Sequence, residues 1–181
     1  MESLKFTGGV GQWIKEYYPE YWGIQRYPAA RCAVFRRVKG AWGIFSNFAP
    51  TPIEFEGTMY SCVEQLFQCM KFTHTAVLDD LRNASGQKIK MKAKHWEKMG
   101  FRRADWGEMV VDMLKECLKL KYEQSQDFRN ALMESGDKYI VEDQTNFPRK
   151  QADAYGCKLE GDTYVGPNLM GRLLMELRND A

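Results

Sequence analysis

Apolar residues at helical spacing recur along most of the chain from Tyr60 onward, and this pattern constrains the fold more than any other feature. Each helix of this kind has an apolar face that must be buried against other helices or a small sheet. The length of 181 residues fits one domain. The sequence therefore predicts a mostly α fold with a small β element (α+β), built as a single compact helical domain. The expected helices are residues 60–72, 85–99, 105–122, 127–134 and 169–178.

Polar residues that can cap helices stand at the start of three of these segments. Ser85 precedes one helix, and Asp105 with Glu108 three residues later resembles a capping box. Asn168 precedes the last helix. We expect these side chains to bond to the free N–H groups of the helical turn that follows each of them.

The expected β element consists of three short segments. Residues 32–38 are rich in β-branched and aromatic side chains, and residues 53–57 alternate apolar with polar ones. Residues 139–141 are a third short apolar run. Residues 147–165 contain one Pro and several Gly, which indicates a loop-rich stretch.

The first 31 residues differ in composition from the rest of the chain. They are rich in Tyr, Trp, Gly and Pro, and residues 13–18 are expected to form a short helix that Pro19 ends. We interpret residues 1–31 as an N-terminal extension packed on a domain of residues 32–181.

Composition and charge exclude several classes of protein. The 26 Lys and Arg nearly balance the 24 Asp and Glu, so the net charge of +2 does not indicate a general nucleic-acid binder. Five Cys, an odd number without a C-x-x-C pair, argue against a disulfide framework and for a reducing compartment. Neither a secretory signal in the first eleven residues nor an apolar run of the ~20 residues that span a bilayer is recognisable. The expected location is the cytoplasm, and no membrane partner is expected.

The chain also lacks an obvious set of metal ligands. It has only two histidines, His74 and His95, and neither lies near paired Cys or carboxylates at a ligand spacing. We therefore expect no metal site and no cofactor.

Three polar residues share one strip of the helix expected at residues 60–72. Glu64, Gln68 and Lys71 lie within roughly 60° of one another, beside the apolar arc, at 3.6 residues per turn. Glu64 and Lys71 are about 10.5 Å apart along the axis, too far for a direct pair. Their long side chains can still converge on one ligand lying over Gln68. The same spacing equally fits a polar stripe at the edge of a half-buried helix.

The functional interpretation of this strip is cleavage of an N-glycosidic bond. Departure of a base leaves positive charge on the sugar, and a carboxylate such as Glu64 can stabilise that charge or activate water. A partly desolvated lysine such as Lys71 can instead attack C1 of the sugar as an amine nucleophile and form a Schiff base. Spacing alone leaves these roles and the polar stripe open.

Positive charge is concentrated in one segment. Such a patch can attract a phosphorylated substrate, although a solvated helix face has the same composition. A Gly-containing entry to the last helix, Gly166-Pro167-Asn168, is a weaker candidate for holding an anion, since ordinary helix caps look alike. Arg36 is a further candidate for phosphate recognition. The segment of concentrated positive charge, called the basic cluster below, contains Lys88, Lys90, Lys92, Lys94, Lys98, Arg102 and Arg103.

Three motifs resemble the YbiA-like NADAR family. They are Phe45-Ser46-Asn47-Phe48, the segment from Glu64 to Phe72 (EQLFQCMKF), and the segment from Asn168 to Arg178 (NLMGRLLMELR). The family's patterns are G-x-x-S-N-F, then S-E-H-Y-F-Q-A-Q-K-F on a helix, then N-x-L-G-x-L-L-M-x-L-R. The motifs occur in order from about Ala33 to Arg178, and three in order are more specific than each one alone.

The resemblance implies a mostly helical domain that acts on ribose N-glycosides. Some family members resemble hydrolases of early phosphoribosylated riboflavin intermediates, and others remove ADP-ribose from guanine bases. By motif match, Glu64 and Lys71 take the catalytic positions, Asn47 falls in the ligand-binding loop, and Gln68 and Asn168 line or support the site. The residues expected to bind the substrate are Arg36, Phe45, Ser46, Asn47, Phe48, Tyr60, Gln68, Asp153 and Asn168.

The sequence departs from the family pattern at three places. Val63, Gln65 and Leu66 replace Ser, His and Tyr around Glu64. The family's D-x-x-W-G signature is approximated by Asp153-Ala154-Tyr155-Gly156 without a Trp, after an apparent insertion at residues 145–151. These departures affect the identity of the substrate more than the class of reaction.

The resemblance leaves three functions to be compared. The leading hypothesis is an N-glycosidase whose partner is a small phosphoribosyl or ADP-ribosyl substrate, or ADP-ribosylated nucleic acid. The alternatives are a module that binds ADP-ribose or an NAD-derived nucleotide without turnover, and an unrelated helical interaction protein. The presence of both Glu64 and Lys71 favours the enzyme, since a pure binder needs neither.

Overall fold

The computed structural model describes residues 9–181, so the first eight residues of the expected N-terminal extension lie outside the described part. The helices are α1 (Val10–Tyr17), α2 (Val63–Cys69), α3 (Thr75–Arg82), α4 (Gln87–Lys98), α5 (Trp106–Gln124), α6 (Gln126–Glu134) and α7 (Leu169–Asn179). The strands are β1 (Gln25–Pro28), β2 (Cys32–Phe35), β3 (Ile53–Phe55), β4 (Thr58–Tyr60), β5 (Tyr139–Glu142), β6 (Lys158–Glu160) and β7 (Thr163–Gly166). The mostly α fold with a small β element is confirmed.

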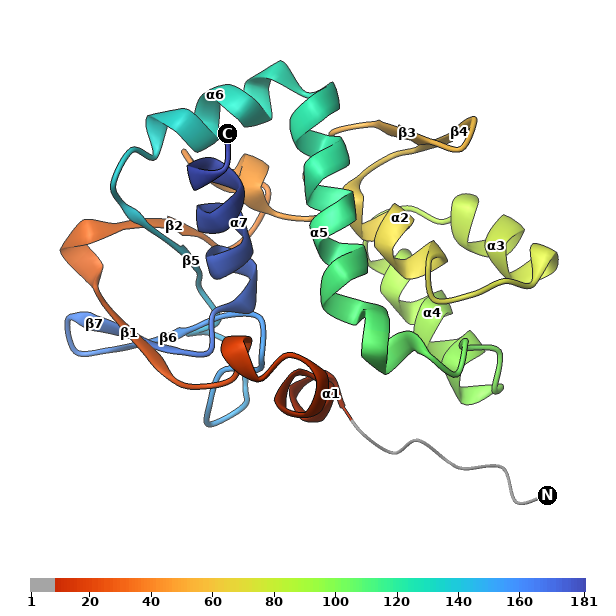
Figure 1. The fold of residues 1–181 in the computed structure, drawn as a ribbon, viewed down its shortest axis with the longest axis horizontal. Coiled ribbons are helices and arrows are strands. Elements are labelled where there is room, and N and C mark those ends of the chain that lie inside the picture. Colours follow the sequence, from red (N-terminus) through yellow and green to blue (C-terminus); the bar gives the residue numbers. More distant parts are fainter. Residues whose placement is uncertain (1–8) are drawn as a thin grey trace.

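Helix α5 is the centre of the fold. It packs against α1, α2, α6, α7 and β3, and in Figure 1 it runs between the α2–α4 side and the side that carries most strands. Its apolar face is fully buried, as the helical period requires: Trp106, Leu114 and Leu118 are each about 1% exposed or less. Gly107 lets α1 approach closely, since a Cβ there would lie 2.7 Å from Cδ1 of Trp13.

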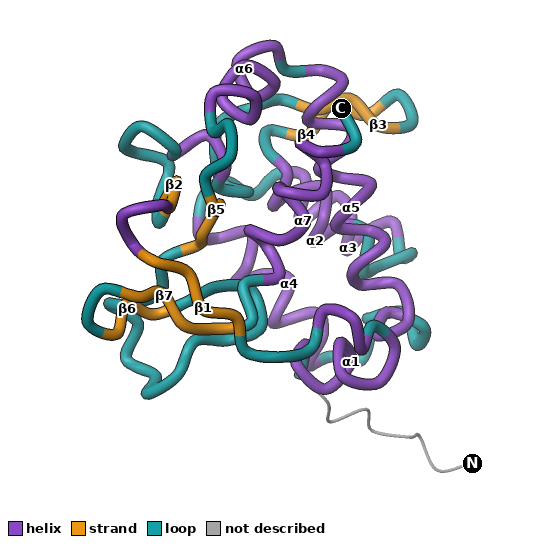
Figure 2. Tube along the Cα trace, turned by 60° about the vertical axis from the view of Figure 1, so that its left-hand side comes forward, coloured by secondary structure: helices purple, strands orange, loops and turns teal. Residues whose placement is uncertain are grey.

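The strands form three small sheets. Strands β1, β7 and β6 make an antiparallel sheet in that order, β3 and β4 make a hairpin, and β2 pairs with β5 in parallel. Figure 2 shows β1, β6 and β7 together on one side of the molecule. In the parallel pair Phe35 lies opposite Glu142. The residues that follow both strands therefore leave the pair at the same edge, where they can share a site.

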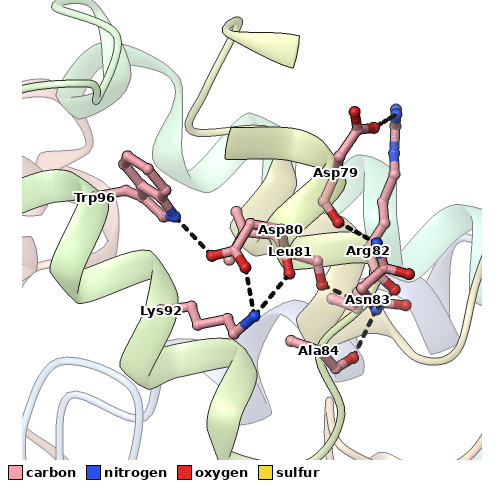
Figure 3. A network of polar contacts seen from close by, with 9 residues as sticks. Asp79, Asp80, Leu81, Arg82, Asn83, Ala84, Lys92 and Trp96 are labelled. Carbon is pink, nitrogen blue, oxygen red and sulfur yellow. Dashed lines mark hydrogen bonds and ion pairs between the residues drawn. The ribbon is translucent and has the colours of Figure 1, made fainter. Parts of the chain in front are cut away.

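The α2, α3 and α4 helices form a unit tied together by polar contacts. The Asp80 carboxylate on α3 accepts hydrogen bonds from Nζ of Lys92 (2.5 Å) and Nε1 of Trp96 (2.9 Å) on α4, as Figure 3 shows. On α2 the buried Gln65 side chain donates to the carbonyl oxygens of Leu81 (3.2 Å) and Ala84 (3.0 Å). These bonds fix the position of α4 relative to α2.

Several local predictions were wrong. Helix α3 was not predicted, because it has only eight residues and buries only Val77 and Leu81. Strands β6 and β7 lie within the stretch expected to be loop-rich, and β1 lies in the Tyr- and Pro-rich segment before residue 32. Their strand character comes from pairing with one another rather than from apolar alternation.

The predicted capping side chains do not act as caps. Asp105 is the N-cap residue of α5, but its carboxylate pairs with Nε of Arg103 (2.6 Å) and makes no cap bond. Gly86, at φ 55°, is the N-cap of α4 in place of Ser85. Asn168 is the N-cap residue of α7, yet its side chain bonds to β5 instead of the helix.

The five cysteines are Cys32, Cys62, Cys69, Cys117 and Cys157, and all are free thiols, so the absence of a disulfide framework is confirmed. Within residues 9–181, no helix combines the length and apolar character that crossing a membrane requires. In the same range, no three His, Cys, Asp or Glu residues gather closely enough to hold a metal ion.

Candidate active site

A cavity of about 490 Å³ lies where α2, α4, α7 and the ends of β2 and β5 meet. Of the predicted site residues, it is lined by Arg36, Ser46, Asn47, Phe48, Glu64, Gln68, Lys71 and Asp153. The structure thus brings both predicted catalytic side chains to one cavity. Its remaining lining residues are Val10, Phe35, Arg37, Phe67, Gln87, Lys90, Trp106, Glu142, Gln144, Phe147, Tyr155 and Met170.

Three predicted site residues do not line this cavity. Phe45 is fully buried, with its ring edge-on to the rings of Phe35 and Phe128. Tyr60 is 4% exposed and its hydroxyl accepts a hydrogen bond from Arg82 (3.3 Å). The Asn168 side chain is fully buried and bridges the carbonyl oxygen of Ile140 (2.9 Å) and the N–H of Glu142 (3.3 Å). These three residues are buried outside the lining of the cavity.

Glu64 is a buried carboxylate held by several partners. All seven residues of α2 are buried, so Glu64 does not lie on a solvated helix edge. Its Oε1 accepts a hydrogen bond from Nε2 of Gln68 (2.7 Å) and lies 3.7 Å from Nζ of Lys90. Its N–H donates to the carbonyl oxygen of Asn47 (2.8 Å). Glu64 also lies in the first turn of α2, beside the positive end of the helix dipole.

Lys71 lies just beyond the end of α2 and forms an ion pair inside the protein. The helix ends at Cys69, two residues before the predicted strip does. The Nζ of Lys71 is 2.6 Å from Oε1 of Glu97, and its side chain is 15% exposed. Nη1 of Arg102 lies 3.4 Å from the other Glu97 oxygen. Glu97 therefore lies within proton-transfer distance of the Lys71 amine, and Arg102 holds Glu97 in place.

A buried lysine fixes the loop that carries Ser46, Asn47 and Phe48. The Nζ of Lys121, on α5, donates to the carbonyl oxygens of Ile44 (2.5 Å) and Ser46 (3.2 Å). Burial lowers the pKa of Lys121 to about 7. Oδ1 of Asn47 is buried and has no hydrogen-bond partner among the described residues, which leaves an acceptor free for a ligand. Sequence reasoning missed Lys121, since it follows the ordinary charge pattern of a long helix.

The lining of the cavity includes a second group of acidic residues. Burial, and next the negative charge of Asp153, raise the pKa of Glu142 to about 7, while Lys90 acts in the opposite direction. Burial also raises the pKa of Tyr155. Sequence reasoning missed Glu142; its place directly after the apolar run 139–141 was the available signal. We call Glu142, Asp153 and Tyr155 the β5 wall, and Glu64, Gln68 and Lys71 the α2 wall.

Positive charge reaches the cavity from only part of the predicted basic cluster. Of its seven members only Lys90 lines the cavity, while Lys92, Arg102 and Arg103 pair with carboxylates. Arg36 and Arg37 line it from the end of β2. The cavity therefore has three cationic side chains besides Lys71.

The start of α7 cannot bind an anion through its backbone. The N–H groups of Asn168, Leu169 and Met170 already donate to the carbonyl oxygens of residues 156, 154 and 155, at 3.2, 3.1 and 3.0 Å. The suggestion of an anion site at Gly166-Pro167-Asn168 was therefore wrong, because tertiary hydrogen bonds satisfy these donors.

A second hollow of about 480 Å³ lies between α5 and α7. None of the predicted site residues lines it. Its charged lining residues include Asp112, Lys115, Glu116 and Lys119. The cavity beside α2 therefore remains the candidate active site.

Comparisons with known proteins agree with this assignment. The NADAR domain family model matches residues 34–180. N-glycosidase YbiA of Escherichia coli (strain K12) is 29% identical over 137 residues, which cover 76% of this chain and 80% of that protein. N-glycosidase Npun_R5314 of Nostoc punctiforme is 28% identical over 148 residues, covering 81% and 90%.

A solved structure is also similar. The NMR structure of the E. coli protein YbiA superimposes with a TM-score of 0.65 at 27% identity, covering 82% of this chain and 83% of that one. The expected resemblance is thereby confirmed in sequence and in fold. The chain belongs to the NADAR domain family and is a homologue of the YbiA-like N-glycosidases.

Proposed function

We propose that this protein hydrolyses the N-glycosidic bond between a ribose and a base in a phosphoribosyl or ADP-ribosyl conjugate. The observation that carries the proposal is a buried carboxylate, Glu64, that lines the same cavity as the Lys71 amine. The names of the E. coli and Nostoc relatives support it. Residues 32–181 are the catalytic domain in this proposal, and residues 1–31 are an extension that adds Val10 to the cavity.

Two residues of the α2 wall, Glu64 and Lys71, act on the sugar. Cleavage of the C1–N bond places positive charge on the ribose, and the ionised Glu64 stabilises that charge. Lys71 transfers a proton to Glu97, 2.6 Å away, and its free amine attacks C1 to give a Schiff base that water later hydrolyses. Arg102 orients Glu97 for this transfer.

The cationic side chains of the cavity select a phosphorylated substrate. Arg36, Arg37 and Lys90 can each bind a phosphate oxygen. A cavity of about 490 Å³ lies in the range of ordinary small-molecule sites. Phosphoribosylated early intermediates of riboflavin synthesis and ADP-ribosylated guanine are the two substrate classes to compare.

Base release from these two substrates, measured in parallel, tests the proposal. We expect the wild-type protein to release the base in the presence of a chelator, because the proposed chemistry uses only carboxyl and amine groups. An unphosphorylated analogue should bind more weakly. Tight binding of ADP-ribose without base release from either substrate would instead support the non-catalytic binding module.

A further inference from the structure

Two glutamates line the same cavity, but their surroundings differ. Glu64 accepts a bond from Gln68 and lies beside Lys90, whereas the Glu142 side chain makes no hydrogen bond or ion pair with any residue of the described range 9–181. We propose that Glu142 is the general acid that protonates the departing base. This assignment rests on the proposed N-glycosidase function and adds the group that acts on the leaving nitrogen.

The backbone of Glu142 is fixed from two sides. It is the last residue of β5, opposite Phe35 in the parallel pair. Its N–H donates to Oδ1 of Asn168 (3.3 Å), and its carbonyl oxygen accepts from the N–H of Cys157 (2.8 Å). A side chain carried by such a fixed strand end can be placed accurately against a reacting atom.

The charged groups around Glu142 come from several elements. Asp153, Tyr155 and Cys157 belong to the segment after β5, Glu64 to α2, and Lys90 to α4. Arg36 and Arg37 line the same cavity from the end of β2. Burial and the charge of Asp153 outweigh Lys90, so the pKa of Glu142 rises to about 7. At neutral pH a large fraction of this carboxyl therefore carries a proton that it can donate.

Its neighbours on the β5 wall are less suited to this role. Oδ1 of Asp153 accepts hydrogen bonds from Nε2 of Gln144 (2.7 Å) and from the N–H of Tyr155 (2.9 Å), so two donors already hold this carboxylate. Burial raises the pKa of the Tyr155 phenol above its ordinary value, so it gives up its proton reluctantly. Glu64 and Glu142, which have different partners in one cavity, divide the charge-stabilising and acid roles between them.

The step balances with the groups present. As the Lys71 amine bonds to C1, the electron pair of the C1–N bond passes to the base nitrogen, which takes the proton from Glu142. The C1–O bond of the ring then opens, and the ring oxygen takes a proton from the new C1–N ammonium, which leaves a protonated Schiff base. Water adds to C1 and releases a proton to solvent, from which the Glu142 carboxyl regains its own. The adduct then breaks down to the sugar aldehyde and the Lys71 amine. Lys71 finally recovers its own proton from Glu97.

The test compares two leaving groups in wild type and Glu142→Gln. One substrate is a phosphoribosylated or ADP-ribosylated base amine that the wild type cleaves, and the other is 4-nitrophenyl ribose 5-phosphate, whose phenolate leaves without a proton. With the amine substrate we expect Glu142→Gln to lower kcat on the order of 10²-fold or more. With the nitrophenyl substrate its kcat should stay near that of the wild type. Glu134→Gln, the same change at an exposed site on α6, is the matched control.

The pH profile gives a second readout. Wild-type kcat on the amine substrate should fall as the pH rises above about 7, and Glu142→Gln should lose this alkaline limb. Equal losses of Glu142→Gln on both substrates, or no loss on either, would overturn the general-acid assignment while leaving the N-glycosidase function standing. If the wild type cleaves neither substrate, the proposed function fails and the acid assignment falls with it.

Discussion

The α2 wall and the β5 wall line one cavity, and their acidic side chains have different surroundings. On the α2 wall, Glu64 receives a hydrogen bond from Gln68, one helical turn away, and lies 3.7 Å from Nζ of Lys90. On the β5 wall, Glu142 is brought close to Asp153 and has no donor of its own within residues 9–181. One carboxyl thus has a hydrogen-bond donor and a cation beside it, whereas burial and the charge of Asp153 raise the pKa of the other.

The comparison shows that partners near in the sequence and partners distant in the sequence contribute differently to this site. Gln68 follows Glu64 by four residues, so the helix itself supplies this donor. The neighbours of Glu142 come from a segment that follows it by more than ten residues and from two other helices. The hydrogen-bond donor of Glu64 is therefore fixed by the local sequence. The raised pKa of Glu142 depends on neighbours that only folding brings close.

The largest effect is expected from Lys71. Replacing it by Ala removes the proposed nucleophile, and kcat should fall on the order of 10³-fold. Borohydride should trap a covalent adduct with the wild type and with neither Lys71→Ala nor Lys71→Arg, since Arg keeps the charge but cannot form a Schiff base. Full activity of Lys71→Arg without an adduct would show that Lys71 acts only as a cation.

Glu64→Gln should have the next largest effect. The change keeps the size of the side chain but removes the charge that opposes the developing cation. We expect kcat to fall on the order of 10²-fold, with substrate binding near normal, in steady-state kinetics and calorimetry. Glu160→Gln, at an exposed position, is the control. Unchanged turnover would mean that Glu64 is only a structural carboxylate.

The smallest effect concerns stability and the β5 wall alone. The pKa of Glu142 is raised from 4.5 to about 7, so its ionisation is disfavoured in the folded state. The wild type therefore loses stability as the pH rises from about 4.5 through 7, and Glu142→Gln removes this loss. At pH 8 we expect Glu142→Gln to unfold in urea with a free energy about 2 kcal/mol higher, allowing for partial exposure.

The same comparison at about pH 3 is the internal control, because this pH lies below both the ordinary pKa of 4.5 and the raised pKa of about 7, so Glu142 is protonated in the folded and the unfolded state alike. The two proteins should unfold alike there. A constant difference between them at both pH values would show that the variant acts through packing and not through charge.

The sequence predicted the parts of the fold that have a strong local signal. The long apolar periodicity of α5 and the last helix, α7, placed both correctly within a few residues. It failed at α3, with two buried apolar residues, and at β6 and β7, which are strands only because they pair with each other. Short helices and strands such as these depend on contacts with other segments of the chain, and a local sequence pattern does not contain those contacts.

The residues of the site also differ in whether the sequence alone identified them. Motif and spacing selected Glu64 and Lys71, and the structure places both at the cavity. They did not identify Glu97, Lys121 or Glu142, because each of these acts through a contact with a distant segment.

What the sequence determined by itself is the longer helices, their apolar faces and the polar residues of the α2 wall, since these repeat at the short range of a helical turn. What only the tertiary structure decided is which polar side chains are buried away from water and which hydrogen-bond or charge partners they acquire. Asn168, expected at the ligand, instead holds β5, and Lys90 alone among the basic cluster reaches the cavity. Protonation depends on burial and on charges from other elements, and those are fixed only when the chain has folded.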